Sequence, residues 1–211
     1  MGLLREKDWK AKWITKKKQK EFSSKGSILL GKDLGGTIQT FALYFRKEFK
    51  TRKKIRGATA WVCGLGFYEL RLNGKKVGDH VLDPAQTEYH KIAFYSTYDV
   101  TGLLQKKNAI GVLLGNGRYI KNHGYGHPKL IVQVQIDYGK GEEETIVSDG
   151  TWKVAYGPLR ENGLYFGERY DARLEMPGWD SSGFEDSSWE NAVAARKTKL
   201  SPQMVQPIRV T

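Results

Sequence analysis

The chain has 211 residues, of which 39% are hydrophobic and 12% aromatic, including 6 Trp and 11 Tyr. This length accommodates one large β domain or two small ones. The single cysteine, Cys63, excludes an internal disulfide framework, and no run approaches the ~18 consecutive apolar residues of a membrane-spanning helix. The first residues show no signal-peptide pattern, so we expect a soluble chain whose compartment the sequence leaves open.

The formal net charge is +12, and the positive excess lies at the N-terminal end. Residues 1–60 hold 17 Lys and Arg against 5 Asp and Glu, whereas residues 61–211 hold 18 of each kind. The runs TKKKQK (15–20) and RKEFKTRKKIR (46–56) suggest a nucleic-acid-binding module, because phosphate contacts depend on dense cations. They lack interleaved aromatic residues, which favours a solvated surface or the protection of edge strands. Attraction to an acidic polysaccharide through the same long-range field is a further alternative.

Extended segments predominate in chain order. The first, QTFALYFRKEF (39–49), alternates large apolar residues with others, and GATAWVCGLGFYELRL (57–72) continues in β-branched and aromatic residues. Further strands are predicted in KIAFYSTYDV (91–100), NAIGVLLGNG (108–117), KLIVQVQIDY (129–138), EETIVSD (143–149) and WKVAYGP (152–158). Turn signals separate nearly all of them, so the pattern predicts an all-β, antiparallel β-sandwich or jelly roll.

Local signals inside these segments are more specific. Asn73-Gly74 supplies the two positive-φ positions of a tight hairpin turn after the strand YELRL. Cys63, within a strand-like run, is interpreted as a small buried apolar residue. Only YDVTGLLQKK (98–107) and FEDSSWENAVAARK (184–197) resemble helices, the first as a single turn that Thr101 could cap.

Several catalytic and metal chemistries fail on context. His123 and His127 have the i,i+4 spacing of zinc ligands, but the glycines and the proline around them disfavour a helix. The chain contains neither a phosphate-binding loop nor a G-x-S-x-G nucleophile elbow. GERYDARLE (167–175) offers carboxylates interleaved with Arg, a pattern that favours an ion-pair ladder over a pair of glycosidase carboxylates. An interdomain contact through Glu168, Asp171 and Arg173 is the alternative.

A carbohydrate site is better supported by the residue types. Sugars present C–H faces to aromatic rings and hydroxyl edges to carboxylates and amides. Two probable loops, DPAQTEY (83–89) and GNGRYIKNHGYG (115–126), combine both kinds of side chain. The candidate carbohydrate-binding residues are Asp83, Glu88, Asn116, Arg118, Tyr119, Asn122 and Tyr125, with ordinary hydrogen bonding within loops as the alternative for each.

The order of a set of motifs carries a family resemblance. DWKAKWI (8–14), CGLGFYELRLNGKKVGDHVLDPAQTEY (63–89), LLGNGRY (113–119), GPLRENGLYFGERYDAR (157–173) and GWDSSGFEDSSW (178–189) follow one another along the chain. This arrangement resembles the N-terminal β-sandwich of bacterial α-L-rhamnosidases, the inverting glycoside hydrolases of family 78, over residues 8–211. The resemblance implies a jelly-roll-like, galactose-binding-like sandwich related to carbohydrate-binding modules.

The resemblance also implies a division of labour. Residues 1–38 would be a connecting segment with an edge strand, residues 39–200 the β-sandwich module, and residues 201–211 a junction toward a further domain. The acid and base carboxylates of the family belong to an (α/α)6 barrel, so we expect no catalytic residue in this chain. The expected partners are the remaining domains of the same polypeptide and L-rhamnose-containing glycans, with no membrane.

Two further expectations follow from the resemblance. Some relatives bind L-rhamnose with calcium in this domain, and Asp79, Asp83 and Glu88 on the segment after the hairpin could supply the oxygen ligands that calcium prefers. If the domain is instead a structural spacer, we expect apolar patches around Trp9, Trp13 and Trp179.

Overall fold

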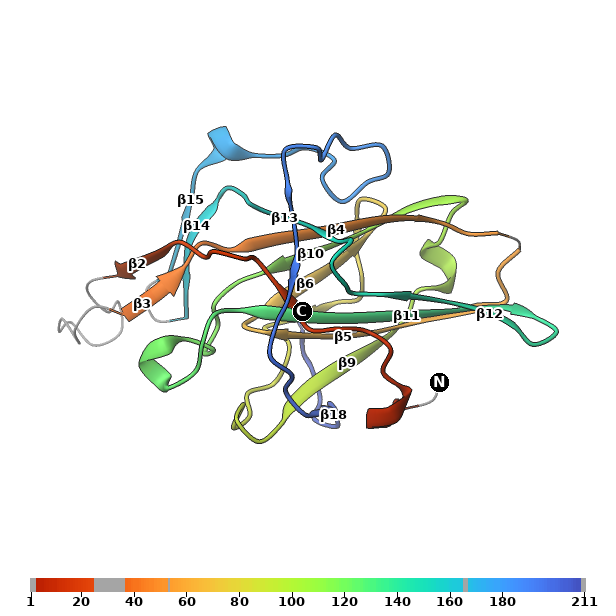
Figure 1. The fold of residues 1–211 in the computed structure, drawn as a ribbon, viewed down its shortest axis with the longest axis horizontal. Coiled ribbons are helices and arrows are strands. Elements are labelled where there is room, and N and C mark those ends of the chain that lie inside the picture. The colour runs from red at the N-terminus through yellow and green to blue at the C-terminus, as the bar shows by residue number, and fades with distance from the viewer. Residues whose placement is uncertain (1–2, 25–36, 53, 165–166, 210–211) are drawn as a thin grey trace.

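The structure is a computed structural model that describes residues 3–24, 37–52, 54–164 and 167–209. Its main body consists of two sheets packed face to face, with smaller ribbons at the ends (Figure 1). All pairs in the two large sheets are antiparallel except β9–β18. The predicted all-β sandwich is therefore confirmed.

The seven-stranded sheet has the order β17-β1-β11-β5-β9-β18, with β12 also paired to β11. Its strands are β1 (Ile14–Thr15), β5 (Gly57–Leu65), β9 (Ala93–Asp99), β11 (Lys129–Gly139), β12 (Glu142–Val147), β17 (Val193–Ala194) and β18 (Leu200–Pro202). β1 thus has a neighbour on each side.

The six-stranded sheet has the order β16-β13-β4-β10-β6-β7. Its strands are β4 (Leu43–Lys50), β6 (Tyr68–Leu72), β7 (Lys75–Lys76), β10 (Lys107–Leu114), β13 (Lys153–Tyr156) and β16 (Glu190–Asn191). The long β4–β10 ladder, with Phe45 opposite Val112, sets the register of this sheet.

Three two-stranded ribbons lie outside the large sheets: β2 (Glu21–Ser24) with β3 (Thr37–Thr40), β8 (His80–Val81) with β19 (Ile208–Arg209), and β14 (Leu159–Gly163) with β15 (Gly167–Tyr170). The β2–β3 and β14–β15 ribbons stand at the same end of the sandwich (Figure 1). Four short 3-10 helices complete the described residues: η1 (Glu6–Asp8), η2 (Thr101–Leu103), η3 (Lys121–His123) and η4 (Ala172–Leu174).

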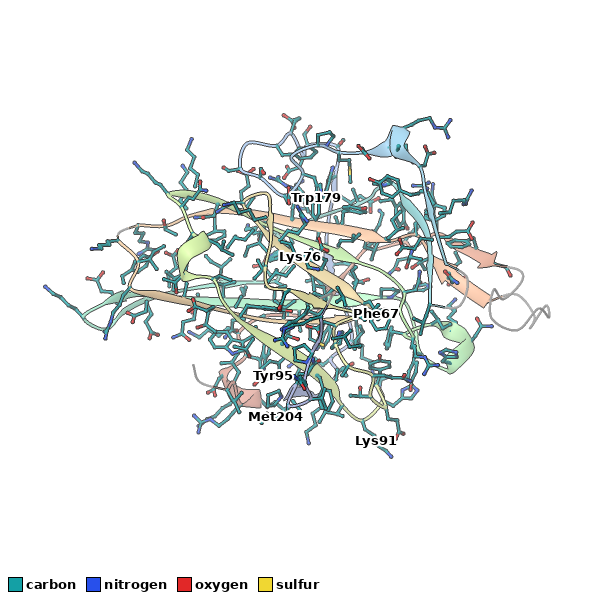
Figure 2. The ribbon with its side chains drawn as sticks, turned by 180° about the vertical axis from the view of Figure 1, so that it is seen from behind. Phe67, Lys76, Lys91, Tyr95, Trp179 and Met204 are labelled. Atoms are coloured by element: carbon teal, nitrogen blue, oxygen red, sulfur yellow. The ribbon has the colours of Figure 1, made fainter. Side chains whose placement is uncertain are left out.

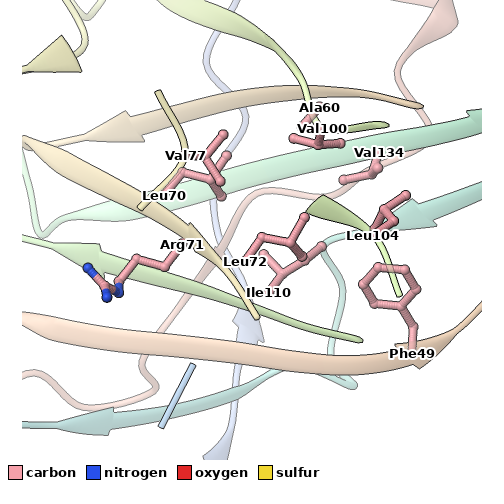
Figure 3. Close-up of a pocket in the computed structure, with 10 residues that line it drawn as sticks. All are labelled: Phe49, Ala60, Leu70, Arg71, Leu72, Val77, Val100, Leu104, Ile110 and Val134. Carbon is pink, nitrogen blue, oxygen red and sulfur yellow. The ribbon is translucent and has the colours of Figure 1, made fainter. Parts of the chain in front are cut away.

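The core lies between the two large sheets and follows from the period-two patterning of their strands. Alternate residues of β6, Tyr68, Leu70 and Leu72, face it, as do Val62 of β5 and Val132 of β11. A small apolar cavity remains between the sheets, where Leu72, Leu104, Ile110 and Phe49 converge while Arg71 points away (Figure 3). Its volume of about 10 Å³ suits one water at most, so this cavity is too small for a sugar.

The outer faces of both sheets are also covered. On the seven-stranded sheet, Trp61, Cys63 and Leu65 pack against segments from both ends of the chain, including Trp13 and Leu200. On the six-stranded sheet, Tyr44 and Trp189 pack with Trp179 and Phe184 from the segment before β16. Trp179 therefore lies at the top of Figure 2, and Tyr95 and Met204 lie at the bottom.

A buried arginine fixes the covering segment on the six-stranded sheet. Arg46 of β4 is 1% exposed, and its guanidinium donates to the carbonyl oxygens of Trp179 and Ser181 at 2.8 and 3.0 Å. The same group pairs with Asp186 and Glu48. The contacts of Arg46 with Trp179, Ser181 and Asp186 span more than 130 residues of sequence. The sheet therefore holds the covering segment, which needs no helix of its own.

Local predictions met mixed outcomes. Asn73 and Gly74 have φ of 52° and 80°, which confirms the hairpin turn between β6 and β7, and Cys63 is confirmed as fully buried. Segment 98–107 does contain one turn, η2, but Thr101 lies inside it and does not cap it. The helix predicted at 184–197 is wrong: that segment forms turns and the short strands β16 and β17, which pair with β13 and β1. Sheet pairing here overrides a weak helical pattern.

No helix among the described residues is both long enough and apolar enough to cross a membrane.

Candidate functional site

Two loops that the sequence marked for carbohydrate binding meet in the structure. They are residues 82–92, between β8 and β9, and residues 115–128, between β10 and β11. The Arg118 guanidinium Nη1 donates to Gln86 Oε1 at 2.6 Å and bridges the loops. The strands that follow the two loops, β9 and β11, both pair with β5, so one end of each loop is held by the seven-stranded sheet.

The loops share a group of three aromatic rings, Tyr89, Tyr119 and Tyr125, here named the tyrosine cluster. Tyr119 and Tyr125 are stacked with ring centroids 5.4 Å apart, and Tyr89 meets both edge-on at 5.4 and 5.0 Å. The exposed His90 ring lies 4.8 Å from Tyr125. This surface thus offers partly exposed rings beside guanidinium, amide and imidazole groups, which is the mixture that sugars require.

Burial raises the pKa of two hydroxyls of the cluster, and one cation lies beside its rings. Burial raises the pKa of Tyr89 to about 12 and also raises that of Tyr119. Lys129 Nζ lies 5.1 Å from the Trp13 centroid and 5.9 Å from the Tyr119 centroid. It donates to the Arg196 carbonyl at 2.6 Å, and burial lowers its pKa to about 8.

Asp83, a candidate for both sugar and metal, has its side chain in the interior. One carboxylate oxygen, Oδ2, lies 2.8 Å from His80 Nδ1 and accepts bonds from the hydroxyls of Ser96 and Tyr98, each at 3.0 Å. The other oxygen accepts from Gln203 Nε2 at 3.1 Å. With 3% of the residue exposed, the carboxylate holds the loop to β9 and to the C-terminal segment and does not face solvent.

Asn116 also has an internal role. It is 1% exposed, and its Oδ1 accepts from the Thr40 backbone N–H at 2.9 Å while its Nδ2 donates to Asn162 Oδ1 at 2.7 Å. Asn122, in η3, accepts a bond from the Ile38 backbone N–H at 2.7 Å. Both asparagines therefore attach the loop to the β2–β3 ribbon. Of the predicted site residues, Asp83 and Asn116 are buried, Glu88 and Asn122 are exposed, and Arg118, Tyr119 and Tyr125 are partly exposed.

The three carboxylates predicted as calcium ligands each have partners within the chain. Asp79 pairs with Arg209 at 2.7 Å, Asp83 has the partners given above, and the exposed Glu88 pairs with Lys91 at 2.9 Å. Within residues 3–24, 37–52, 54–164 and 167–209, no three His, Cys, Asp or Glu side chains are grouped as a metal site.

The residues predicted for an interdomain contact lie on and beside the β14–β15 ribbon, at the six-stranded sheet. Asp171 accepts two hydrogen bonds from the Arg173 guanidinium, at 2.8 and 2.7 Å, so these two residues pair with each other at the surface of the chain. Glu168, on β15, is exposed. This group is distinct from the tyrosine cluster, which lies over the seven-stranded sheet.

Sequence reasoning missed Gln86, Tyr89, His90 and Lys129 as members of the loop surface. The first two belong to the quoted loop DPAQTEY, and His90 follows it directly, so the loop itself was the available signal. Lys129 begins β11, and only the packing of Trp13 and Tyr119 around it reveals its place.

Comparisons with known proteins agree on one family. A model of the α-L-rhamnosidase N-terminal domain matches residues 53–211. An α-L-rhamnosidase of Formosa agariphila is 38% identical over 99% of this chain and 24% of its own length. The solved α-L-rhamnosidase of Dictyoglumus thermophilum superposes with a TM-score of 0.91 and 48% identity, over 98% of this chain and 23% of that one.

A third relative was solved with a sugar. The α-L-rhamnosidase of Streptomyces avermitilis, in complex with L-rhamnose, has a TM-score of 0.77 and 34% identity, over 82% of this chain and 18% of that one. The present chain therefore spans about a quarter or less of the length of the relatives that it matches.

Proposed function

The chain belongs to the α-L-rhamnosidase N-terminal domain family, and from this premise we propose that it is a non-catalytic accessory β-sandwich of an α-L-rhamnosidase. The observation that carries the proposal is the match of nearly the whole chain to about a quarter of each relative. The remaining domains of such an enzyme would be its partners, and they would hydrolyse terminal α-L-rhamnose from glycosides or polysaccharides.

The chemistry of the loop surface supports an accessory role. An inverting glycosidase needs a carboxylic acid and a carboxylate on opposite sides of the scissile bond. Of the two carboxylates predicted beside the tyrosine cluster, Asp83 is buried against four hydrogen-bond partners and Glu88 pairs with Lys91. Neither is poised to transfer a proton to a bound sugar.

We further propose that the tyrosine cluster binds an L-rhamnose-type sugar. L-rhamnose is a 6-deoxy sugar, so its methyl group and C–H face suit the rings of Tyr119 and Tyr125, and its hydroxyls suit the Arg118–Gln86 bridge and His90. Two observations support this proposal. The 2.6 Å hydrogen bond from Arg118 Nη1 to Gln86 Oε1 joins the two loops, and the two stacked rings are partly exposed.

Two measurements test the two halves of this proposal. With p-nitrophenyl α-L-rhamnopyranoside, the chain should give no turnover; turnover that disappears on changing one of its own carboxylates would overturn the accessory role. Calorimetry with L-rhamnose, with and without calcium, tests the binding half. Absence of heat at millimolar sugar in both conditions would overturn that half alone.

Variants locate the sugar site. Tyr125→Ala removes one stacked ring and should weaken L-rhamnose binding by about tenfold, since a ring–sugar contact contributes on the order of 1 kcal/mol. The matched control is Tyr138→Ala, which removes a partly exposed tyrosine at the end of β11 away from the loop. Equal losses in both variants would contradict the assignment.

A structural spacer is the second candidate, and exposed apolar side chains near the C-terminal end favour it. Met204 is 78%, Val205 50% and Ile208 57% exposed, although they lie beside the ordered β18 and β19. The exposed apolar side chains do not lie at the three tryptophans where the patch was expected, because Trp13 is buried and Trp9 and Trp179 are partly buried. Hydrophobic-dye fluorescence that falls on Met204→Ser with Ile208→Ser, while L-rhamnose gives no heat, would favour the spacer.

A further inference from the structure

A pocket of roughly 480 Å³ at the β14–β15 end of the sandwich has no role in the function proposed above. It is here named the arginine pocket, and its walls come from the segment between β3 and β4, both strands of the β14–β15 ribbon and η4. Its chemistry is set by three arginines, two aromatic rings and one carboxylate: Phe41, Arg160, Arg169, Tyr170, Asp171 and Arg173.

The three arginines differ in the partners that their guanidinium groups already have. Arg169 Nε pairs with Glu161 at 2.7 Å, and Arg173 makes the bidentate pair with Asp171. Arg160 stacks over Phe41, with its guanidinium carbon 4.0 Å from the ring centroid. Its Nη1 lies 3.3 Å from the Gly157 carbonyl, and it forms no ion pair within the part of the chain that the structure describes.

The pocket therefore has one positive charge more than its internal partners neutralise. Asp171 stays ionised, with its pKa lowered to about 2 mainly by the hydrogen bonds from Arg173, but both of its carboxylate oxygens are engaged by Arg173, and Arg160 acts on it only through the field. Burying an arginine face against a ring leaves its donors directed outward in a fixed fork, which matches a carboxylate or sulfate.

The basic N-terminal run, which the proposed function leaves unexplained, lies beside this pocket. Tyr156 contacts the Phe41 ring edge-on at 5.5 Å, and its hydroxyl accepts from the Lys20 backbone N–H at 2.6 Å and donates to the Lys18 carbonyl at 3.1 Å. Lys18 and Lys20 are exposed. Their charges add to the field at the pocket, and a polyanion would be drawn to this end of the molecule.

Tyr170 supplies the apolar surface that a simple ion site would lack. It is 55% exposed and stands on β15 between the arginine pocket and a larger groove, of roughly 620 Å³, lined by Trp179 and Tyr44. An exposed ring next to an arginine fork fits a ligand that combines a C–H face with an anionic group.

We propose that the arginine pocket is a second sugar-binding site, for an anionic sugar that places its carboxylate or sulfate on Arg160 and its ring on Tyr170. The site is separate from the tyrosine cluster, and it extends the ligands of the chain to the acidic units of a polysaccharide. Binding there requires no L-rhamnose at the tyrosine cluster.

The test is calorimetry of the 211-residue chain at low ionic strength with methyl β-D-glucuronide, glucose 6-sulfate and neutral methyl β-D-glucoside. We expect at least one of the two anionic sugars to bind, and we expect the neutral sugar to bind with an affinity at least about tenfold lower. The arm that gives the tighter binding identifies the carboxylate or the sulfate. Absence of binding by both anions, or equal binding of the neutral sugar, would overturn the proposal.

Variants separate the pocket from general charge. Arg160→Gln should weaken the anion at least about tenfold, and Arg160→Lys should restore only part of it because the fork is lost. The matched control is Arg52→Gln, which removes the same charge from a side chain that is 77% exposed. Equal losses for the Arg160 and Arg52 variants would overturn the site.

Two checks keep this test decisive. If Arg160→Gln lowers the melting temperature so far that the chain is unfolded during the titration, Tyr170→Ala replaces it, because that ring is exposed and its loss should still weaken binding. A single-stranded DNA of the same charge should bind less tightly than an oligoglucuronide. Equal or tighter DNA binding would mark an unselective basic surface and overturn the sugar site.

Discussion

The Asp83→Ala substitution tests the conclusion that a loop carboxylate acts inside the fold. Asp83 accepts from or lies against His80, Ser96, Tyr98 and Gln203, whose positions range from 3 to 120 residues away in sequence. Truncation to alanine removes the acceptor shared by all of them. We expect the free energy of unfolding to fall substantially.

The magnitude follows from the burial of the donors. Ser96 and Tyr98 are 4% and 8% exposed, so water replaces Asp83 poorly, and the loss of a charged acceptor costs each buried hydroxyl about 1–3 kcal/mol. The Tyr98 hydroxyl keeps the Tyr68 hydroxyl at 3.2 Å, so its cost lies at the lower end of this range. His80 and Gln203 are more exposed and can turn to water, so they add little. The expected loss is therefore about 4 kcal/mol, within a range of about 2–6 kcal/mol.

Urea denaturation at pH 7, followed by tryptophan fluorescence, measures this loss as a shift of the midpoint at constant slope. The matched control is Asp79→Ala, which removes the same charge from a side chain that is 65% exposed and pairs only at the surface. Its expected cost is under about 1 kcal/mol. Equal midpoints for the two variants would refute the reasoning that burial of the donors sets the cost.

Two other predictions concern pH and the hairpin. Because burial lowers the pKa of Lys129 to about 8, the unfolded chain binds more protons than the folded one between about pH 8 and the ordinary lysine pKa. Lys129 should therefore make stability rise with pH in that window, and Lys129→Met should flatten the rise between about pH 7.5 and 9.5 by up to about 2 kcal/mol. Urea midpoints of both proteins at pH 7.5 and 9.5 measure the difference, and parallel profiles would count against it. Gly74→Ala should cost about 1–2 kcal/mol, because Gly74 has φ +80° and an added Cβ would lie 3.0 Å from Ser181 Oγ. Gly102→Ala, where an added Cβ meets nothing within 4 Å, is its control, and equal thermal shifts would show that the backbone conformation is not the cause.

Patterns that act over a few residues made much of the fold predictable. The alternation in β6 and the Asn73-Gly74 turn depend only on neighbouring side chains and on backbone conformations open to those residue types. Segment 184–197 shows the limit, because its helix-like spacing gave way to pairing with β13 and β1. The competing pairing lies far away in sequence and leaves no trace in the local pattern.

The candidate site was predictable at the level of loops and less so at the level of side chains. Composition marked two loops, which the Arg118–Gln86 bridge joins in the structure. It did not distinguish Asp83 and Asn116, which turn inward, from Tyr125, which stays partly exposed. A polar residue in a loop has the same local pattern whether its partner is water or a buried group.

The sequence alone determined the alternating strands, the hairpin, the buried cysteine and the family, since these rest on residue order and short-range stereochemistry. The tertiary structure decided which charged and polar groups are consumed internally: Arg46 by a segment more than 130 residues away, Asp83 by a glutamine 120 residues away, and Asn116 by Thr40. The physical reason is that a polar group is buried only where its partners are supplied, and here those partners come from distant strands brought together by the packing of two sheets.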